Sequence, residues 1–150
     1  MTREEDALTD KNQNLVNDGS TSITSVGDDY FVEHEGVCFA GTHLLVELWG
    51  ARNLTDLEAV KSALCEAAEA AGATVLQVHV HQFDASTGVT GVAVLAESHI
   101  TIHTWPERKF AALDIFMCGG CNPHHCLPVL RRVFAPTQLE VSEHKRGIVR

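Results

Sequence analysis

The sequence is poor in basic residues. It has 11 lysines and arginines against 20 aspartates and glutamates, a formal net charge of −9 at pH 7. Nucleic-acid binding needs a basic face that neutralises phosphates, so this balance argues against DNA or RNA as a partner. A small cationic substrate suits an acidic surface better, although net charge acts mainly on solubility and on the rate of encounter.

Long apolar runs are also missing. No stretch approaches the ~20 consecutive apolar residues that a membrane-spanning helix needs. The first residues lack the basic segment and apolar core of a secretory signal. We therefore expect a cytoplasmic protein with no membrane partner. The five cysteines are then expected to be reduced, and their odd number leaves at least one free thiol.

The N-terminal segment differs in composition from the rest of the chain. Residues 1–30 hold seven acidic and two basic side chains and few large apolar ones. Such a segment buries too little apolar surface to offset the entropy lost on folding. We therefore assign residues 1–40 to a flexible acidic tail, with order beginning near Gly41. Residues 41–150 form one domain, a size that a single core supports.

The segment after the tail alternates between strand-like and helix-like patterns. The first predicted helix has Thr55 and Glu58 in a capping box, and Gly72 is placed to end it. The second starts at the cap residue Asn122, with a kink or a delayed start at Pro128. Runs rich in β-forming residues predict strands at 43–49, 74–83, 89–97, 98–104, 110–117 and 137–144.

The resulting order is β-α-β-β-β-β-α-β. Strands in runs and few helices predict an α+β fold, a two-layer sandwich of an antiparallel or mixed sheet with two helices on one face. The other face of the sheet still needs cover. We therefore expect a homodimer in which two sheets face each other.

The segment AESHITIHTWPE, residues 96–107, concentrates the polar side chains. Strand alternation puts Ser98 and Ile100 on one face and His103 on the other. This periodicity alone favours an ordinary polar-faced strand, and Ser98 lacks the G-x-S-x-G elbow of hydrolases. A hairpin, however, can fold Cys118 back towards Ser98. Together with aromatic side chains expected near the same ends, this makes a pocket with a nucleophile, a base and a thiol. The aromatic residues are Phe83, Trp105 and Phe110.

Cys118 also opens a C-x2-C-x2-H-H-C pattern that offers zinc ligands. The other members of the pattern are Cys121, His124, His125 and Cys126. A structural zinc site normally draws on two separated ligand pairs, whereas these residues crowd into nine positions, so no metal is expected. A zinc-stabilised binding module that is never cleaved remains an alternative.

The segment around Ser98 resembles the processing site of prokaryotic S-adenosylmethionine decarboxylase proenzymes, which depend on a pyruvoyl group. The spacing from Ser98 to His103 and Cys118 fits that family. So do GTHLLVELWG at 41–50, GVTGVAVLAES at 88–98 and SEHKRG at 142–147. The resemblance begins at about residue 41 and leaves out the tail. Pyruvoyl-dependent arginine or ornithine decarboxylases share this fold and stay open as an alternative.

The resemblance implies that the proenzyme cleaves itself between Glu97 and Ser98. The Ser98 hydroxyl attacks the carbonyl of Glu97, and Thr90 matches the residue that supports the developing oxyanion. His103 matches the base that takes the α-proton of Ser98. Elimination and hydrolysis leave a pyruvoyl group, derived from Ser98, on the fragment 98–150.

The resemblance also implies a second reaction at the same site. The pyruvoyl carbonyl forms a Schiff base with S-adenosylmethionine and takes up electrons as CO2 leaves, giving decarboxylated S-adenosylmethionine for spermidine synthesis. Cys118 matches the proton donor. The active unit is expected to be a homodimer of cleaved protomers. The positions that match substrate-binding residues are Phe83, Ile100, Trp105 and Glu107.

Overall fold

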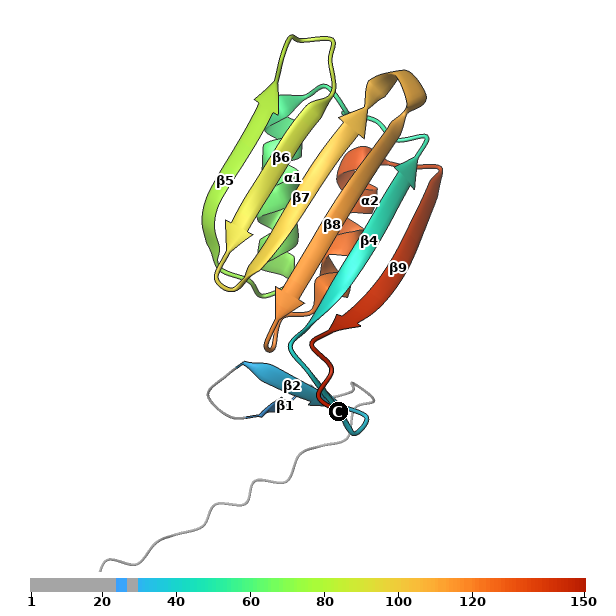
Figure 1. Cartoon of the computed structure of the whole chain (residues 1–150). Helices are drawn as coiled ribbons and strands as arrows, with labels where there is room; N and C mark the ends of the chain where they lie inside the picture. The colour runs from blue at the N-terminus through green and yellow to red at the C-terminus, as the bar shows by residue number, and fades with distance from the viewer. Residues whose placement is uncertain (1–23, 27–29) are drawn as a thin grey trace, which may run out of the picture.

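The computed structural model describes residues 24–26 and 30–150. Its main body has two layers, a sheet and a pair of helices (Figure 1). The helices are α1 (Leu57–Ala70) and α2 (Cys126–Phe134). The strands of the main sheet are β4 (Gly41–Trp49), β5 (Val75–Gln82), β6 (Val89–Leu95), β7 (Ser98–Trp105), β8 (Phe110–Cys118) and β9 (Gln138–Arg146).

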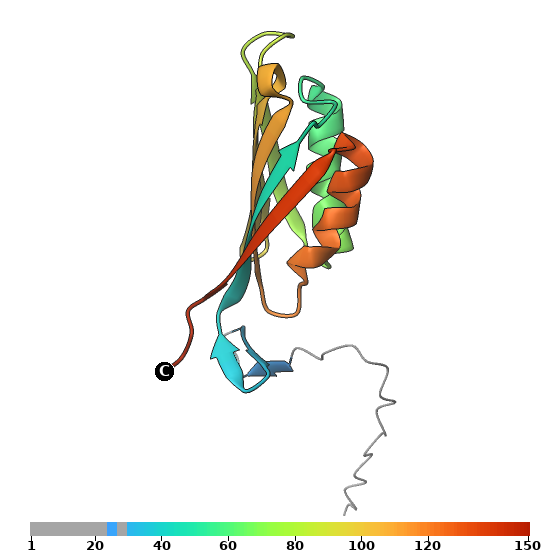
Figure 2. The same cartoon turned by 90° about the vertical axis from the view of Figure 1, so that its right-hand side faces the viewer.

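The main sheet is antiparallel throughout, in the order β5-β6-β7-β8-β4-β9. Both helices lie against the same side of it, as Figure 2 shows. The predicted order of elements and the predicted α+β sandwich are therefore confirmed. We call the side of the sheet away from α1 and α2 the open face. Within the described ranges, no helix is long and apolar enough to cross a membrane.

The core lies between the helices and the sheet because each element is apolar on one side. In α1, Val60 and Leu64 recur at helical spacing and are fully buried. In β7, Ile100 is fully buried and Ser98, on the same side, is 8% exposed. His103 lies on the open face and is exposed. The predicted division of β7 into two faces is thus confirmed.

The predicted cap of α1 is wrong by one residue. Asp56, not Thr55, has the extended backbone of an N-cap, and its Oδ1 accepts a hydrogen bond from the Ala59 N–H at 3.0 Å. Hydroxyl and carboxylate side chains both suit this position, so the local sequence does not choose between the two neighbours. Gly72 follows the end of the helix as predicted, with a φ of 82° that favours glycine.

Replacing Asp56 by alanine is expected to lower the free energy of unfolding by about 1 kcal/mol, because the Ala59 N–H loses its acceptor. Thr55→Ala is the matched control, with an expected change below about 0.5 kcal/mol. Both changes are made in Ser98→Ala protein, so that one intact chain unfolds. Urea denaturation followed by circular dichroism measures them. A greater loss for Thr55→Ala than for Asp56→Ala would contradict the cap assignment.

The second helix starts after residue 122. Of the two predicted possibilities, a kink or a delayed start at Pro128, the structure shows a delayed start. A 3-10 turn, η2 (Pro123–His125), comes first, and the Asn122 side chain accepts a hydrogen bond from the His124 N–H at 3.0 Å. The α-helix begins at Cys126, so Pro128 falls in its first turn. Backbone N–H groups there have no partner within the helix, and proline therefore breaks no helical hydrogen bond.

Regular structure begins before Gly41, contrary to the prediction. A second antiparallel sheet, the N-terminal sheet, consists of β1 (Thr24–Val26), β2 (Phe31–His34) and β3 (Val37–Phe39). Val32 and Phe39 face each other across β2 and β3, and each is 2% exposed. Both residues lie beyond the acidic residues 1–30, and their pairing depends on strand register, which composition does not encode. The flexible tail predicted over 1–40 is therefore wrong for these strands, whereas residues 1–23 and 27–29 lie outside the described residues.

Candidate active site

The bond between Glu97 and Ser98 lies at the tip of a tight hairpin. Strands β6 and β7 pair up to Leu95 and Ser98, which leaves only Ala96 and Glu97 in the turn. Glu97 has a φ of 63°, in the left-handed region. A residue with a β-carbon held there costs roughly 1–3 kcal/mol. The peptide bond predicted to break therefore follows a strained residue.

The hairpin between β7 and β8 brings Cys118 beside Ser98, as the sequence predicted. His99 pairs with Phe116 across the two strands, so the start of β7 meets the end of β8. The Cys118 N–H donates a hydrogen bond to the Ser98 Oγ at 3.0 Å. This bond fixes the hydroxyl of a side chain that is itself almost fully buried.

The Cys118 thiol is held in its protonated form. Partial burial raises its pKa above the ordinary 9.0, and the nearby Glu97 carboxylate raises it further. A hydrogen bond with the Ser98 side chain opposes these effects but is smaller than burial. At neutral pH the thiol therefore keeps its proton and can donate it.

We expect the alkylation of Cys118 by iodoacetamide to rise with pH and to level off only above pH 9. Iodoacetamide reacts with the thiolate form. Because the pKa of the Cys118 thiol is raised, this form appears only at higher pH. Peptide mass mapping between pH 7 and pH 10 measures the rate. The same cysteine in urea-unfolded protein serves as control and should level off at lower pH. Equal profiles for the folded and unfolded chains would contradict the assigned environment.

The two residues predicted to assist processing lie together, but away from Ser98. His103 and Thr90 are paired across β6 and β7, and the His103 Nδ1 lies 3.2 Å from the Thr90 Oγ1. His103 lies five residue steps from Ser98 along one strand, which corresponds to about 16 Å between their Cα atoms. His103 therefore does not reach Ser98 of its own chain.

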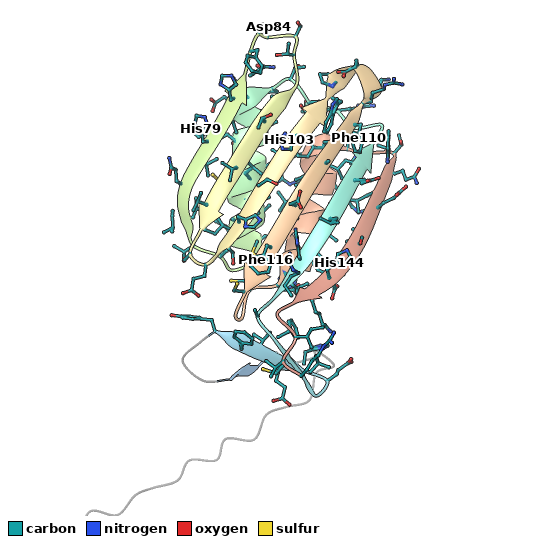
Figure 3. All side chains as sticks on the ribbon, viewed as in Figure 1. His79, Asp84, His103, Phe110, Phe116 and His144 are labelled. Atoms are coloured by element: carbon teal, nitrogen blue, oxygen red, sulfur yellow. The ribbon has the colours of Figure 1, made fainter. Side chains whose placement is uncertain are left out.

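The predicted aromatic residues also lie at the far end of the sheet, which corrects the expectation that they surround Ser98. Trp105 ends β7, and its ring stacks on that of Phe110 with 5.3 Å between centroids. Phe83, which follows β5, is 89% exposed. Figure 3 labels Phe110 near one end of β8 and Phe116 near the other, where Cys118 lies. The length of β7 separates Ser98 from Trp105 by about 23 Å.

Two predicted substrate contacts have different surroundings. Ile100 lies two residues from Ser98 on the same side of β7 and is fully buried. Glu107 lies in a 3-10 turn, η1 (Pro106–Arg108), directly after Trp105, and is exposed. Ile100 therefore belongs to the end of the sheet that holds Ser98 and Cys118. Glu107 belongs to the end that holds the aromatic residues.

The residues of the possible zinc pattern point to separate partners. The Cys121 thiol donates to the Gly72 carbonyl, and the buried Cys126 thiol donates to the Ala67 carbonyl. His124 pairs with Glu143. In the part of the chain that the structure describes, no three metal-ligating side chains gather in one group.

A polar cluster on the open face was not singled out by the sequence. The His43 Nε2 lies 3.0 Å from Asp114 Oδ1, and the Arg146 guanidinium lies 3.2 Å from the His43 Nδ1. Because arginine only donates hydrogen bonds, Nδ1 accepts and Nε2 carries the proton that it donates to Asp114. The cluster joins β4, β8 and β9, and only the register between these distant segments could have revealed it.

Comparison with known proteins identifies the family of the chain. The family model described as S-adenosylmethionine decarboxylase matches residues 42–147. A protein of Thermomicrobium roseum named S-adenosylmethionine decarboxylase proenzyme is 44% identical over 110 residues, which are 73% of this chain and 95% of that protein. A Methanococcus vannielii protein of the same name is 48% identical over 112 residues, 73% of this chain and 91% of its own.

A solved structure agrees as well. The crystal structure of the adenosylmethionine decarboxylase from Aquifex aeolicus superposes with a TM-score of 0.64 at 33% identity. The match covers 75% of this chain and 94% of that one. Sequence and fold together assign the chain to the S-adenosylmethionine decarboxylase family.

Proposed function

We propose that this protein is an S-adenosylmethionine decarboxylase made as a proenzyme, which cleaves itself between Glu97 and Ser98. One observation carries the proposal. Ser98 is the first residue of β7 and directly follows the strained Glu97. Its hydroxyl accepts a hydrogen bond from the Cys118 N–H. Serine nucleophile and thiol thus meet at one turn, inside the segment that matches the family. We place the activity in the cytoplasm, where thiols stay reduced.

The position of Ser98 suits attack on the bond that precedes it. Its Oγ and the Glu97 carbonyl carbon flank the same peptide bond, so attack closes a five-membered ring and turns the amide into an ester. Relief of the left-handed Glu97 conformation favours opening of the turn. A base must then take the Ser98 α-proton so that the ester eliminates, and we assign this step to His103 of a second protomer. We assign support of the oxyanion to Thr90, which contacts that histidine.

The residues around Ser98 fit a pyruvoyl group derived from it. The cut falls in a turn, so β6 and β7 keep their ladder, and the new terminus stays beside Cys118. A pyruvoyl carbonyl supplies an electron sink for the electron pair that decarboxylation releases. The protonated Cys118 thiol then gives its proton to the substrate carbon.

The two fragments, 1–97 and 98–150, are interleaved. Strand β4 belongs to the first fragment and lies between β8 and β9 of the second. Separation of the fragments would break both of these ladders and also that of β6 with β7. We therefore expect the cleaved protein to stay in one folded unit.

The active unit is proposed to be a homodimer in which opposite ends of the two sheets lie against each other. The open face carries large apolar side chains, with Leu45 40% exposed and Trp105 40% exposed, which a second sheet would cover. A two-fold axis that lies between the sheets and across the strands reverses strand direction. It brings the Ser98 end of one protomer against the His103 end of the other, which completes the site.

In this dimer, each substrate would contact both chains. Ile100 comes from the chain that supplies Ser98. Phe83, Trp105 and Glu107 come from the partner, where an aromatic face attracts the positively charged sulfonium and a carboxylate accepts hydrogen bonds from hydroxyl groups. The substrate would thus be held by residues that lie at opposite ends of a single sheet.

Release of CO2 from carboxyl-labelled substrates tests the activity. Purified, cleaved protein is incubated separately with S-adenosylmethionine, arginine and ornithine, and the labelled gas and the amine product are measured. We expect CO2 from S-adenosylmethionine alone. Release from arginine or ornithine in its place would instead identify an amino-acid decarboxylase on this fold.

A further inference from the structure

The N-terminal sheet lies outside the part of the chain that the family model matches. The family match begins at residue 42, and 110 residues of this chain already cover 95% of the Thermomicrobium roseum protein. That protein is too short to hold a counterpart of the sheet. In Figure 1 the N-terminal sheet lies beyond the end of the main sheet where β7 starts and β8 stops, and Figure 2 agrees from the side.

Backbone hydrogen bonds fix the N-terminal sheet to the end of the chain. The Val149 N–H donates to the Cys38 carbonyl at 2.9 Å, and the Ala40 N–H donates to the Arg146 carbonyl at 2.8 Å. Gly147 allows the close approach, because a β-carbon on it would come within 2.8 Å of the Ala40 β-carbon. The N-terminal sheet thus has a defined position beside β9.

The side chain of Tyr30, which directly precedes β2, lies beside the turn that follows Cys118. The Tyr30 ring has its Cδ1 3.9 Å from the place that a β-carbon on Gly119 would occupy. Gly119 has a φ of 61° and directly follows Cys118, whose N–H holds the Ser98 Oγ. Tyr30 is 58% exposed, so its ring does not serve the core.

We propose that Tyr30 is a positioning residue for the turn after Cys118. Its ring packs against Gly119, limits the movement of the Cys118 backbone, and covers the thiol on the solvent side. The hydrogen bond from Cys118 to the Ser98 hydroxyl then keeps the geometry needed for attack on Glu97. This inference rests on the proposed self-cleavage. It gives the segment before residue 42 a role in that reaction.

Two measurements on Tyr30→Ala test the inference. The first is the rate of self-cleavage of freshly purified proenzyme, followed by intact mass. The second is the rate of Cys118 alkylation in uncleaved Ser98→Ala protein, which does not depend on activity. We expect cleavage to slow by about threefold or more, since small misplacements of reacting groups have large effects on rate. We expect alkylation to accelerate by about threefold or more as the cover is removed.

Matched variants separate positioning from general loss of structure. Tyr30→Phe keeps the ring and should behave as wild type in both measurements. Val37→Ala alters an exposed side chain of the N-terminal sheet that Tyr30 precedes, and it should also leave both rates unchanged. If Tyr30→Ala does not accumulate as folded protein, Tyr30→Leu, which also lacks the ring, takes its place.

The outcomes distinguish this inference from the proposed function. Wild-type protein that never cleaves would overturn the proposed function and with it this role. Wild-type protein that cleaves while Tyr30→Ala matches it in both rates would overturn the role of Tyr30 alone. A loss in Val37→Ala equal to that in Tyr30→Ala would also overturn it, because folding of the whole sheet would then explain the effect.

Discussion

Protein with alanine in place of Ser98 is expected to remain one chain of 150 residues and to lose all decarboxylase activity. Alanine has no hydroxyl to attack the Glu97 carbonyl, and it cannot become a pyruvoyl group. Removal of a nucleophile typically lowers the rate by more than about 10³-fold, and here the electron sink disappears as well. Intact mass under denaturing conditions and release of labelled CO2 measure the two losses.

Ser62→Ala is the control for this experiment. Ser62 is an exposed residue of α1, far in the chain from the turn, and alanine suits a helix. The control should cleave and decarboxylate as wild type does. Appearance of fragments 1–97 and 98–150 in Ser98→Ala protein would contradict the assigned nucleophile.

Mixed dimers of Ser98→Ala and His103→Asn chains are expected to recover cleavage that neither variant shows alone. Asparagine cannot act as the base at neutral pH, so His103→Asn homodimers should stall. His103 lies about 16 Å from Ser98 along its own strand, so in the proposed dimer the partner supplies the base. In the mixed dimer, the His103→Asn chain keeps its Ser98 and receives His103 from the Ser98→Ala chain.

Two affinity tags allow the mixed dimer to be isolated and its chains to be told apart. Only the His103→Asn chain should be cut, and one complete site of two should give about half of the wild-type activity per dimer. The control is a dimer of two Ser98→Ala chains that carry the two different tags, and it should stay uncut. Cleavage absent from the His103→Asn chain of the mixed dimer would contradict a site shared between protomers.

Local patterns in the sequence predicted most of the fold. Helical spacing in α1 and strict alternation in β7 gave the buried faces, because burial acts on every third or fourth residue of a helix and every second residue of a strand. The same alternation separated Ser98 from His103. The meeting of Cys118 with Ser98 followed from a hairpin between consecutive strands, a short-range connection that sequence order alone suggests.

Other features depended on contacts between distant segments. The insertion of β4 between β8 and β9 and the His43–Asp114 pair arise from register that no local pattern encodes. The N-terminal sheet is held by hydrogen bonds to residues 146 and 149, at the other end of the chain. Composition does not encode such contacts, and the extension of the tail from residue 30 to residue 40 therefore missed the sheet.

The site was partly misread for a simpler physical reason. Ser98 and Trp105 are close in sequence, and this closeness suggested one pocket. A continuous strand, however, puts seven residue steps at about 23 Å, so residues at its two ends cannot line the same pocket of one chain. The strand prediction itself contained this consequence, and it points towards a second protomer as the source of the missing groups.

The most direct test of the central claim is the intact mass of the purified protein under denaturing conditions, with and without borohydride. Self-cleavage predicts two species, residues 1–97 and 98–150, and a gain of two hydrogens on the smaller one when its ketone is reduced. A single species of 150 residues that borohydride leaves unchanged, after time for slow maturation, would contradict the account.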